Sequence, residues 1–84
     1  MNQRELYRRI RTNEEYRQLA SDPGFQVSID IGGRFFRAMI GDKARAFIAW
    51  RRVRTLETAI EWLQSEVREF YPHSRYGERL AARK

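Results

Sequence analysis

Residues 25–40, FQVSIDIGGRFFRAMI, decide the fold because two alternating stretches flank a pair of glycines. Apolar side chains at every second position from Phe25 to Ile31 predict a strand with one buried face. Gly32 and Gly33 supply the two positive φ angles of a tight two-residue turn, so residues 34–40 should return as a second strand. The sequence therefore predicts a β-hairpin.

The same turn predicts which residues of the hairpin face each other. The pairs expected on the buried face are Ile29 with Phe36 and Val27 with Ala38. The opposite face carries Phe35, Arg37 and Met39 beside Ser28 and Asp30. We expect the apolar members of this opposite face to pack under the N-terminal helix or to form a dimer interface. Stacking of Phe35 on nucleic-acid bases is the alternative.

A third strand is predicted after a second turn at residues 41–43. It covers Ala44 to about Val53, and both of its faces are apolar enough to pack. A two-residue turn would bury Phe47 and Ala49, whereas a three-residue turn would bury Ala46, Ile48 and Trp50. Both facings stay open at the level of sequence.

Helices are predicted on both sides of the strands in the sequence. Residues 2–20 read as helix, in one piece or two, and a capping box of Thr12 and Glu15 would begin the second piece. Thr55 is a good N-cap for a long helix that ends before Pro72. The apolar stripe of this helix consists of Leu56, Ala59, Ile60, Leu63, Val67 and Phe70.

The predicted fold class is therefore α+β, in the order α-β-β-β-α, with a three-stranded antiparallel meander and the C-terminal helix packed on one face. We expect a single domain over residues 1–84. Within it, residues 1–11 form a basic N-terminal helix or arm, residues 12–71 form the core, and residues 72–84 form a basic, mobile tail.

The composition argues against catalysis. The chain has no cysteine and a single histidine, His73, which lies in the predicted tail with nothing to orient it. We therefore expect that the protein is not an enzyme and that it binds neither a metal nor a cofactor. No apolar run approaches the roughly 20 residues that span a bilayer, and none follows the basic N-terminus, so we expect neither membrane insertion nor a signal peptide. A cytoplasmic location, in a prokaryotic, phage or plasmid context, fits this composition.

Positive charge is the feature that points to a partner. Fifteen arginines and two lysines against eleven acidic residues give a net charge of +6, and the planar fork of arginine suits phosphates and guanine edges. Residues 34–54 carry seven basic residues against one acidic residue, residues 1–11 and 73–84 are also basic, and residues 55–71 are acidic. The predicted nucleic-acid contacts are Arg34, Arg37, Lys43, Arg45, Arg51, Arg52 and Arg54. Auxiliary contacts from the two arms are Arg8, Arg9, Arg11, Arg75 and Arg79, and Phe35 is the predicted stacking residue.

Residues 33–63 resemble a known class of DNA-binding module. The stretch Gly-Arg-Phe-Phe-Arg-Ala-Met-Ile at 33–40, a strand ending at Trp50, and Val-Arg-Thr at 53–55 leading into Ala59, Trp62 and Leu63 are similar to three-stranded-sheet-plus-helix domains. These include the arm-binding domains of phage and conjugative-transposon tyrosine recombinases and the plant AP2 domains. The resemblance implies a sheet in the major groove that reads bases through Arg34, Arg37, Arg45 and Arg51. Thr58 departs from the pattern, which has glutamate there.

The α-β-β-β-α order, with Ile-Gly-Gly-Arg at 31–34, is also similar to double-stranded-RNA-binding domains. Those families place lysines at the start of the last helix, where this chain has Thr55-Leu56-Glu57-Thr58. We therefore favour a small, non-enzymatic DNA-binding accessory or regulatory protein of a mobile element, with duplex DNA as its partner. The alternatives are a regulator or inhibitor that recognises an acidic protein, and a binder of duplex RNA. A homodimer is compatible with each.

Overall fold

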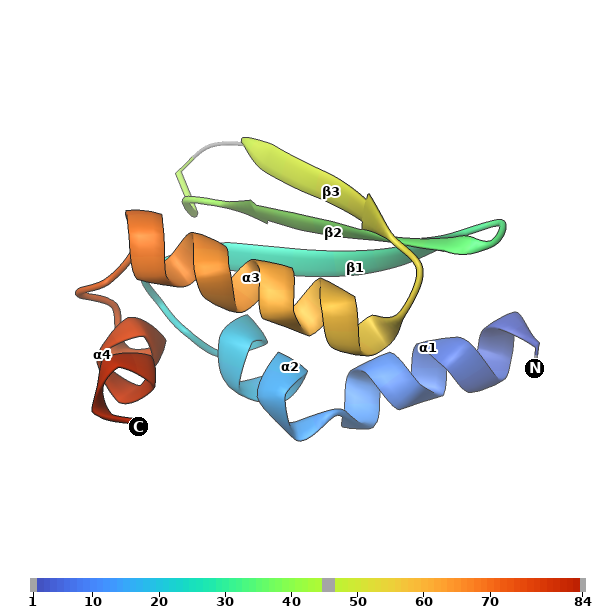
Figure 1. Cartoon of the computed structure of the whole chain (residues 1–84), viewed down its shortest axis with the longest axis horizontal. Helices are drawn as coiled ribbons and strands as arrows, with labels where there is room; N and C mark the ends of the chain where they lie inside the picture. Colours follow the sequence, from blue (N-terminus) through green and yellow to red (C-terminus); the bar gives the residue numbers. More distant parts are fainter. Residues whose placement is uncertain (1, 45–46, 84) are drawn as a thin grey trace.

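The computed structural model describes residues 2–44 and 47–83. Along the chain these form α1 (Gln3–Thr12), α2 (Glu14–Ala20), β1 (Gln26–Gly32), β2 (Phe35–Gly41), β3 (Ala49–Val53), α3 (Leu56–Phe70) and α4 (Arg75–Ala82). The strands form one antiparallel sheet in the order β1-β2-β3. Figure 1 shows the sheet as one layer and the helices as a second layer on one side of it. The predicted α+β class and meander are confirmed.

The hairpin has the predicted faces but a different register. Ile29 pairs with Ala38 and Val27 with Ile40, whereas Phe36 and Ala38 were the expected partners. The loop consists of Gly33 and Arg34, and Gly33 alone has a positive φ, of 62°. One positive φ at the first loop position is the type II′ pattern rather than the expected Gly-Gly turn. Because the shift is two residues, every side chain stays on its predicted face.

The third strand starts later than predicted, at Ala49 rather than Ala44. Ala49 and Val53 lie on the helix-covered side, so the facing that buries Ala49 is correct. The facing that buries Trp50 and Ile48 is wrong, since these side chains are 60% and 63% exposed. Ala46, also part of that prediction, lies outside the described residues. Phe47 is exposed too, because the connection from β2 to β3 is longer than either predicted turn.

The two N-terminal helices meet at Asn13, which is the N-cap of α2 and accepts a hydrogen bond from the N–H of Tyr16 at 2.9 Å. The predicted capping box is therefore wrong by one residue, because the hydroxyl of Thr12 donates back to the carbonyl of Arg8. Helix α3 begins after Thr55 as predicted, and the Thr55 hydroxyl accepts from the N–H of Thr58 at 3.0 Å.

The core lies between the sheet and the helical layer. From α3 it receives Ala59, Ile60, Leu63 and Val67, as the apolar stripe predicted. Phe70 was expected there as well, but its side chain is 61% exposed. Its neighbour Tyr71 packs against the ring of Phe25 instead, with the two ring centres 5.4 Å apart.

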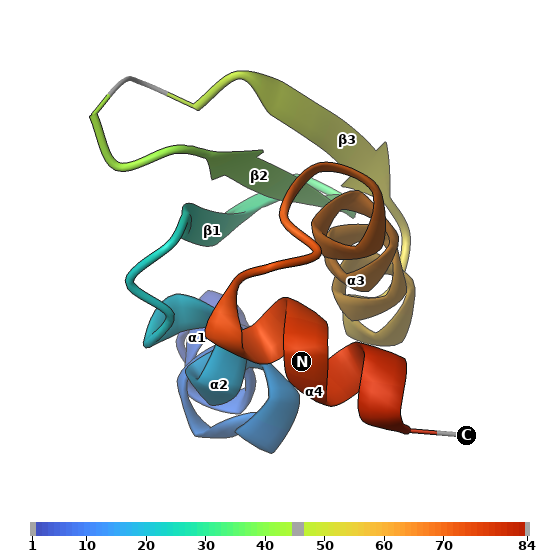
Figure 2. The same cartoon turned by 90° about the vertical axis from the view of Figure 1, so that its left-hand side faces the viewer.

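Residues 72–83 do not form the predicted tail. Pro72 follows the end of α3 as expected, but α4 then begins after Ser74, whose hydroxyl accepts from the N–H of Gly77. Tyr76 and Leu80 are buried in the same cluster as Ile10 of α1, so neither end of the described chain is a detached arm. Figure 2 shows α4 beneath α3 and next to α2. None of the helices within residues 2–44 and 47–83 has the length and apolar character to cross a membrane.

Candidate nucleic-acid interface

One face of the sheet is covered by α1, α2 and α3, and no described element packs on the other (Figures 1 and 2). We call this uncovered side the open face. The alternation of the strands and their register place on it Ser28, Asp30, Phe35, Arg37, Met39, Trp50 and Arg52. The expectation that Phe35 and Met39 pack under the N-terminal helix is therefore wrong, because α1 lies against the opposite side of β1.

The basic residues of the open face gather around one aromatic ring. The guanidinium carbons of Arg52 and Arg54 lie 6.0 and 5.8 Å from the ring centre of Phe35. Arg37 is the cross-strand neighbour of Arg52 and approaches the carboxylate of Asp30 at 3.5 Å. We call Phe35, Arg37, Arg52 and Arg54 the Phe35 cluster. Cation–π contacts at exposed sites contribute about 0.5–1 kcal/mol each, enough to bias where these long side chains rest.

The surface at the Phe35 cluster is hollowed. Phe35, Arg37 and Arg52 line, with Asp30, a depression of about 220 Å³ at the hairpin end of the sheet. Arg34 stands in the adjoining turn and is exposed. Asp30 is the one acidic side chain on the described part of this face. The result is a concave, cationic surface with the Phe35 ring in its lining. In nucleic-acid-binding proteins, arginines and aromatic rings of this kind contact phosphates and bases.

The other predicted contacts of residues 34–54 do not belong to this cluster. Arg51 pairs with Ala38 and so lies on the helix-covered side, at the free edge of β3. Lys43 is exposed beyond the opposite end of β2. Arg45 is outside the described residues. The sequence predicted one basic face, whereas the structure divides these residues among the open face, the sheet edge and the far end.

The auxiliary basic residues all lie in the helical layer. Arg8 forms an ion pair with Glu5 at 2.7 Å, and Arg11 is exposed in the last turn of α1. Arg75 is exposed at the start of α4, and Arg79 lies 5.8 Å from the ring centre of Tyr76. They are thus separated from the open face by the thickness of the sheet.

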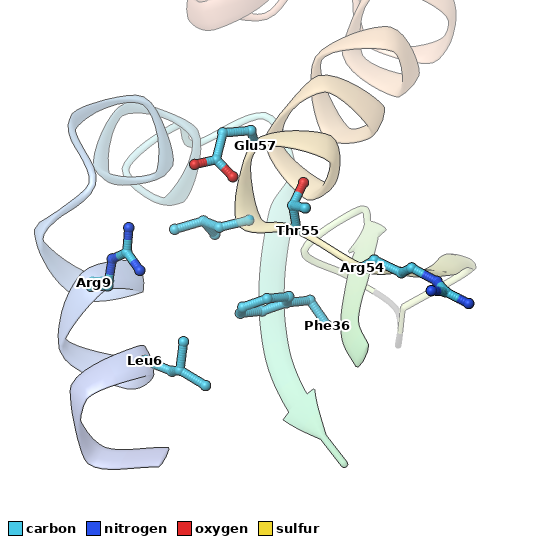
Figure 3. Close-up of a pocket in the computed structure, with 7 residues that line it drawn as sticks. Leu6, Arg9, Phe36, Arg54, Thr55 and Glu57 are labelled. Atoms are coloured by element: carbon cyan, nitrogen blue, oxygen red, sulfur yellow. The ribbon is translucent and has the colours of Figure 1, made fainter. Parts of the chain in front are cut away.

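Arg9 lines a second hollow, of about 230 Å³, between α1 and the start of α3. Figure 3 shows Arg9 and Leu6 directed from α1 toward Phe36 and the N-terminal turn of α3, while the guanidinium of Arg54 points away from them. The hollow is lined on the α3 side by Thr55, Leu56 and Glu57. Arg54 lines this hollow too, but its guanidinium lies over the Phe35 ring rather than beside Arg9.

Trp50 is the residue of the open face that the sequence did not single out. It pairs with Met39, next to the Phe35 cluster, and is 60% exposed. A large aromatic side chain left in water on a basic face is a candidate contact residue. The sequence does contain a hint, the run Trp50-Arg51-Arg52. Side chains alternate along a strand, so once the facing of β3 is known, Trp50 and Arg52 fall on the open face and Arg51 on the covered side.

Acidic side chains lie behind the sheet. Glu57, Glu61 and Glu69 are exposed on α3, which packs against β2 and β3 from the covered side. Burial and the nearby carboxylate of Glu69 raise the pKa of Glu66. Helix α3 therefore places carboxylates behind the sheet, opposite the arginines of the open face, while α1 and α4 add arginines of their own to the helical layer.

No three histidine, cysteine or carboxylate side chains gather as a metal site in the part of the chain that the structure describes. The sequence matches no known protein family and no curated protein, and the fold matches no solved structure.

Proposed function

We propose that this protein binds duplex DNA through the open face of its sheet. The Phe35 cluster is the observation that carries the proposal, since it brings three guanidinium groups together on an uncovered surface. Within residues 2–44 and 47–83, Arg37 alone among these three has a carboxylate partner, and that pair is exposed and long at 3.5 Å. Arginine forks of this kind can contact phosphate oxygens and the O6 and N7 atoms of guanine.

The dimensions of the sheet support the same proposal. Neighbouring strands are about 4.8 Å apart, so three strands measure about 10 Å across. The major groove of B-DNA is about 12 Å wide, and sheet elements are known to enter it. The acidic helix α3 would then face away from the phosphates, and like-charge repulsion would disfavour the reversed orientation.

The helical-layer arginines have a minor role in this proposal. Arg8 is held by Glu5, and Arg83 by Glu15 at 3.1 Å, so part of their charge is already neutralised within the protein. Their long-range field would still attract DNA at low ionic strength.

Fluorescence anisotropy with a labelled duplex of random sequence is the test. If binding releases the counterions of three to four phosphates, the affinity should fall by about 40- to 150-fold between about 50 and 200 mM salt. An affinity that does not change with salt would refute the proposal. Competition with unlabelled duplex RNA identifies the nucleic acid, because equal competition would show recognition of duplexes in general rather than of DNA.

A matched pair of double charge reversals locates the surface. Arg37→Glu with Arg52→Glu should weaken binding more than about tenfold, since both side chains would face the phosphates. Arg11→Glu with Arg75→Glu changes the net charge equally, but in the helical layer, and should cost less than about threefold. The reverse ranking would place the DNA on the helices.

A further inference from the structure

The free edge of β3 has an unpaired backbone and charged side chains that the proposed DNA contact does not explain. In the order β1-β2-β3, β3 pairs with β2 on one side and with no described strand on the other. Figure 2 shows β3 at the margin of the sheet, above α3. An unpaired edge presents backbone N–H and C=O groups that can accept another strand. The other edge strand, β1, contains no basic residue, whereas β3 contains two arginines and is followed by a third.

A groove runs beside this edge. A hollow of about 460 Å³ between β3 and α3 is lined by Arg51, Arg52, Val53, Arg54, Thr58, Glu61 and Trp62. Trp62 is half-buried against the core, so its exposed part offers an apolar wall. Arg51 has no ion-pair partner within residues 2–44 and 47–83, and Glu61, on the facing helix, does not pair with it. An added strand would therefore find both a backbone partner and a place for its side chains.

The charges of β3 decide which strand fits. If two copies of the chain paired antiparallel around the middle of β3, Arg51 would lie directly opposite Arg51 of the second copy. Like charges directly opposite one another destabilise a strand pair, so this edge disfavours a second copy. A strand with carboxylates at the same positions would instead form opposite-charge pairs.

We propose that the edge of β3 binds an extended acidic segment of another protein as a fourth strand of the sheet. Successive side chains of such a segment point to opposite faces. A carboxylate on the groove side would meet Arg51, and a carboxylate at the next position would meet Arg52 on the open face. An apolar neighbour on the groove side would contact Trp62. Arg51, on the covered side of the sheet, takes no part in the proposed DNA contact, whereas Arg52 would serve both binding modes.

The probe is a blocked seven-residue peptide, Thr-Val-Glu-Glu-Val-Thr-Val, titrated into the isotope-labelled full chain to about 1 mM. Backbone amide shifts should concentrate on residues 49–53 and on the indole N–H of Trp62. The same peptide with Lys-Lys in place of Glu-Glu should bind about tenfold more weakly. Shifts absent at the highest concentration, or confined to the hairpin end of the sheet around Phe35 and Arg37, would overturn the proposal.

Two N-methylated peptides separate strand addition from simple charge attraction. Methylation of alternate backbone nitrogens removes the donors on one edge of the peptide only. Strand addition therefore requires that one of the two alternately methylated peptides loses binding while the other keeps it. Equal binding by both would show that charge alone is responsible and would overturn the proposal.

A charge reversal on the protein completes the test. Arg51→Glu should weaken peptide binding about tenfold, whereas Arg34→Glu, the same change in the hairpin turn, should alter it less than about twofold. The circular dichroism of both variants shows that they fold. Either proposal can fail alone, since DNA binding and peptide binding are measured separately and Arg51 belongs only to the peptide surface.

Discussion

The carboxylate of Asp22 accepts a hydrogen bond from the backbone N–H of Tyr76 at 2.6 Å, although 54 residues separate the two in the sequence. Its other oxygen accepts the N–H of Gly24 at 2.7 Å, and the residue is 2% exposed. Asp22 thus joins the loop before β1 to the first turn of α4. This contact, together with the buried Tyr76 ring, is what converts the expected tail into a helix of the core.

Replacement of Asp22 by alanine should lower the free energy of unfolding by about 2–4 kcal/mol. The change removes a charged acceptor and leaves the N–H of Tyr76 buried without a partner. Urea denaturation followed by circular dichroism measures the loss. Asp30→Ala is the control, because it breaks only an exposed ion pair and should cost less than about 1 kcal/mol. Equal losses in the two variants would contradict the role given to Asp22.

Gly77→Ala should destabilise the protein by about 2 kcal/mol or more, although alanine is the better helix former. A Cβ atom there would lie 2.4 Å from the carbonyl oxygen of Tyr71 and 2.9 Å from that of Pro72. Backbone atoms cannot move aside as a flexible side chain can. Gly32→Ala is the matched variant, since nothing lies within 4 Å of its Cβ, and its stability should stay within about 1 kcal/mol of the parent. Thermal unfolding of both variants tests the contrast.

The ionised carboxylate of Glu15 should stabilise the folded protein, and this stabilisation should be lost in acid. Burial would raise its pKa, but hydrogen bonds from Tyr76 and Arg83 outweigh this effect, so the pKa lies below its ordinary value of 4.5. A carboxyl with a lowered pKa in the folded state stabilises the protein above its unfolded-state pKa. That contribution is lost as the pH falls through the folded-state value.

The variant Glu15→Gln should therefore show a shallower loss of stability than the parent between about pH 6 and pH 3. Glu14→Gln serves as the control, because that exposed neighbour makes none of these contacts. Urea titrations at four or more pH values give the comparison. Parallel curves for the parent and Glu15→Gln would show that the carboxylate carries no pH-dependent stability.

Arg52→Gln should reduce the slope of log affinity for DNA against log salt by about 0.9, the share of one phosphate contact. Arg68→Gln removes the same charge from the exposed surface of α3, behind the sheet, and should leave that slope unchanged. Anisotropy titrations at four salt concentrations are sufficient. A change of slope in Arg68→Gln and none in Arg52→Gln would exclude the open face as the contact surface.

The faces of β1 and β2 could be predicted from sequence because alternation has a period of two and tolerates a two-residue slip. The register could not, since it depends on which residues near Gly33 form the loop. The facing of β3 could not be predicted either. The arginines of the Phe35 cluster could therefore be named from the sequence, but they could not be distinguished from Arg51, which lies on the other side of the sheet. Helix α4 was not predicted because only two apolar side chains, Tyr76 and Leu80, anchor it in the core. Its hydrogen-bond partners, Asp22 and Glu15, are also distant in the sequence.

The burial of Tyr76 has a consequence for how the chain acquires its structure during synthesis. Its ring is wholly buried, and its hydroxyl and backbone bond to Glu15 and Asp22 near the beginning of the chain. The side of the core formed by the N-terminal helices is therefore complete only after Tyr76 has been synthesised. Completing it closes a loop of 54 residues between Asp22 and Tyr76, which costs chain entropy that the local contacts of each helix do not cost.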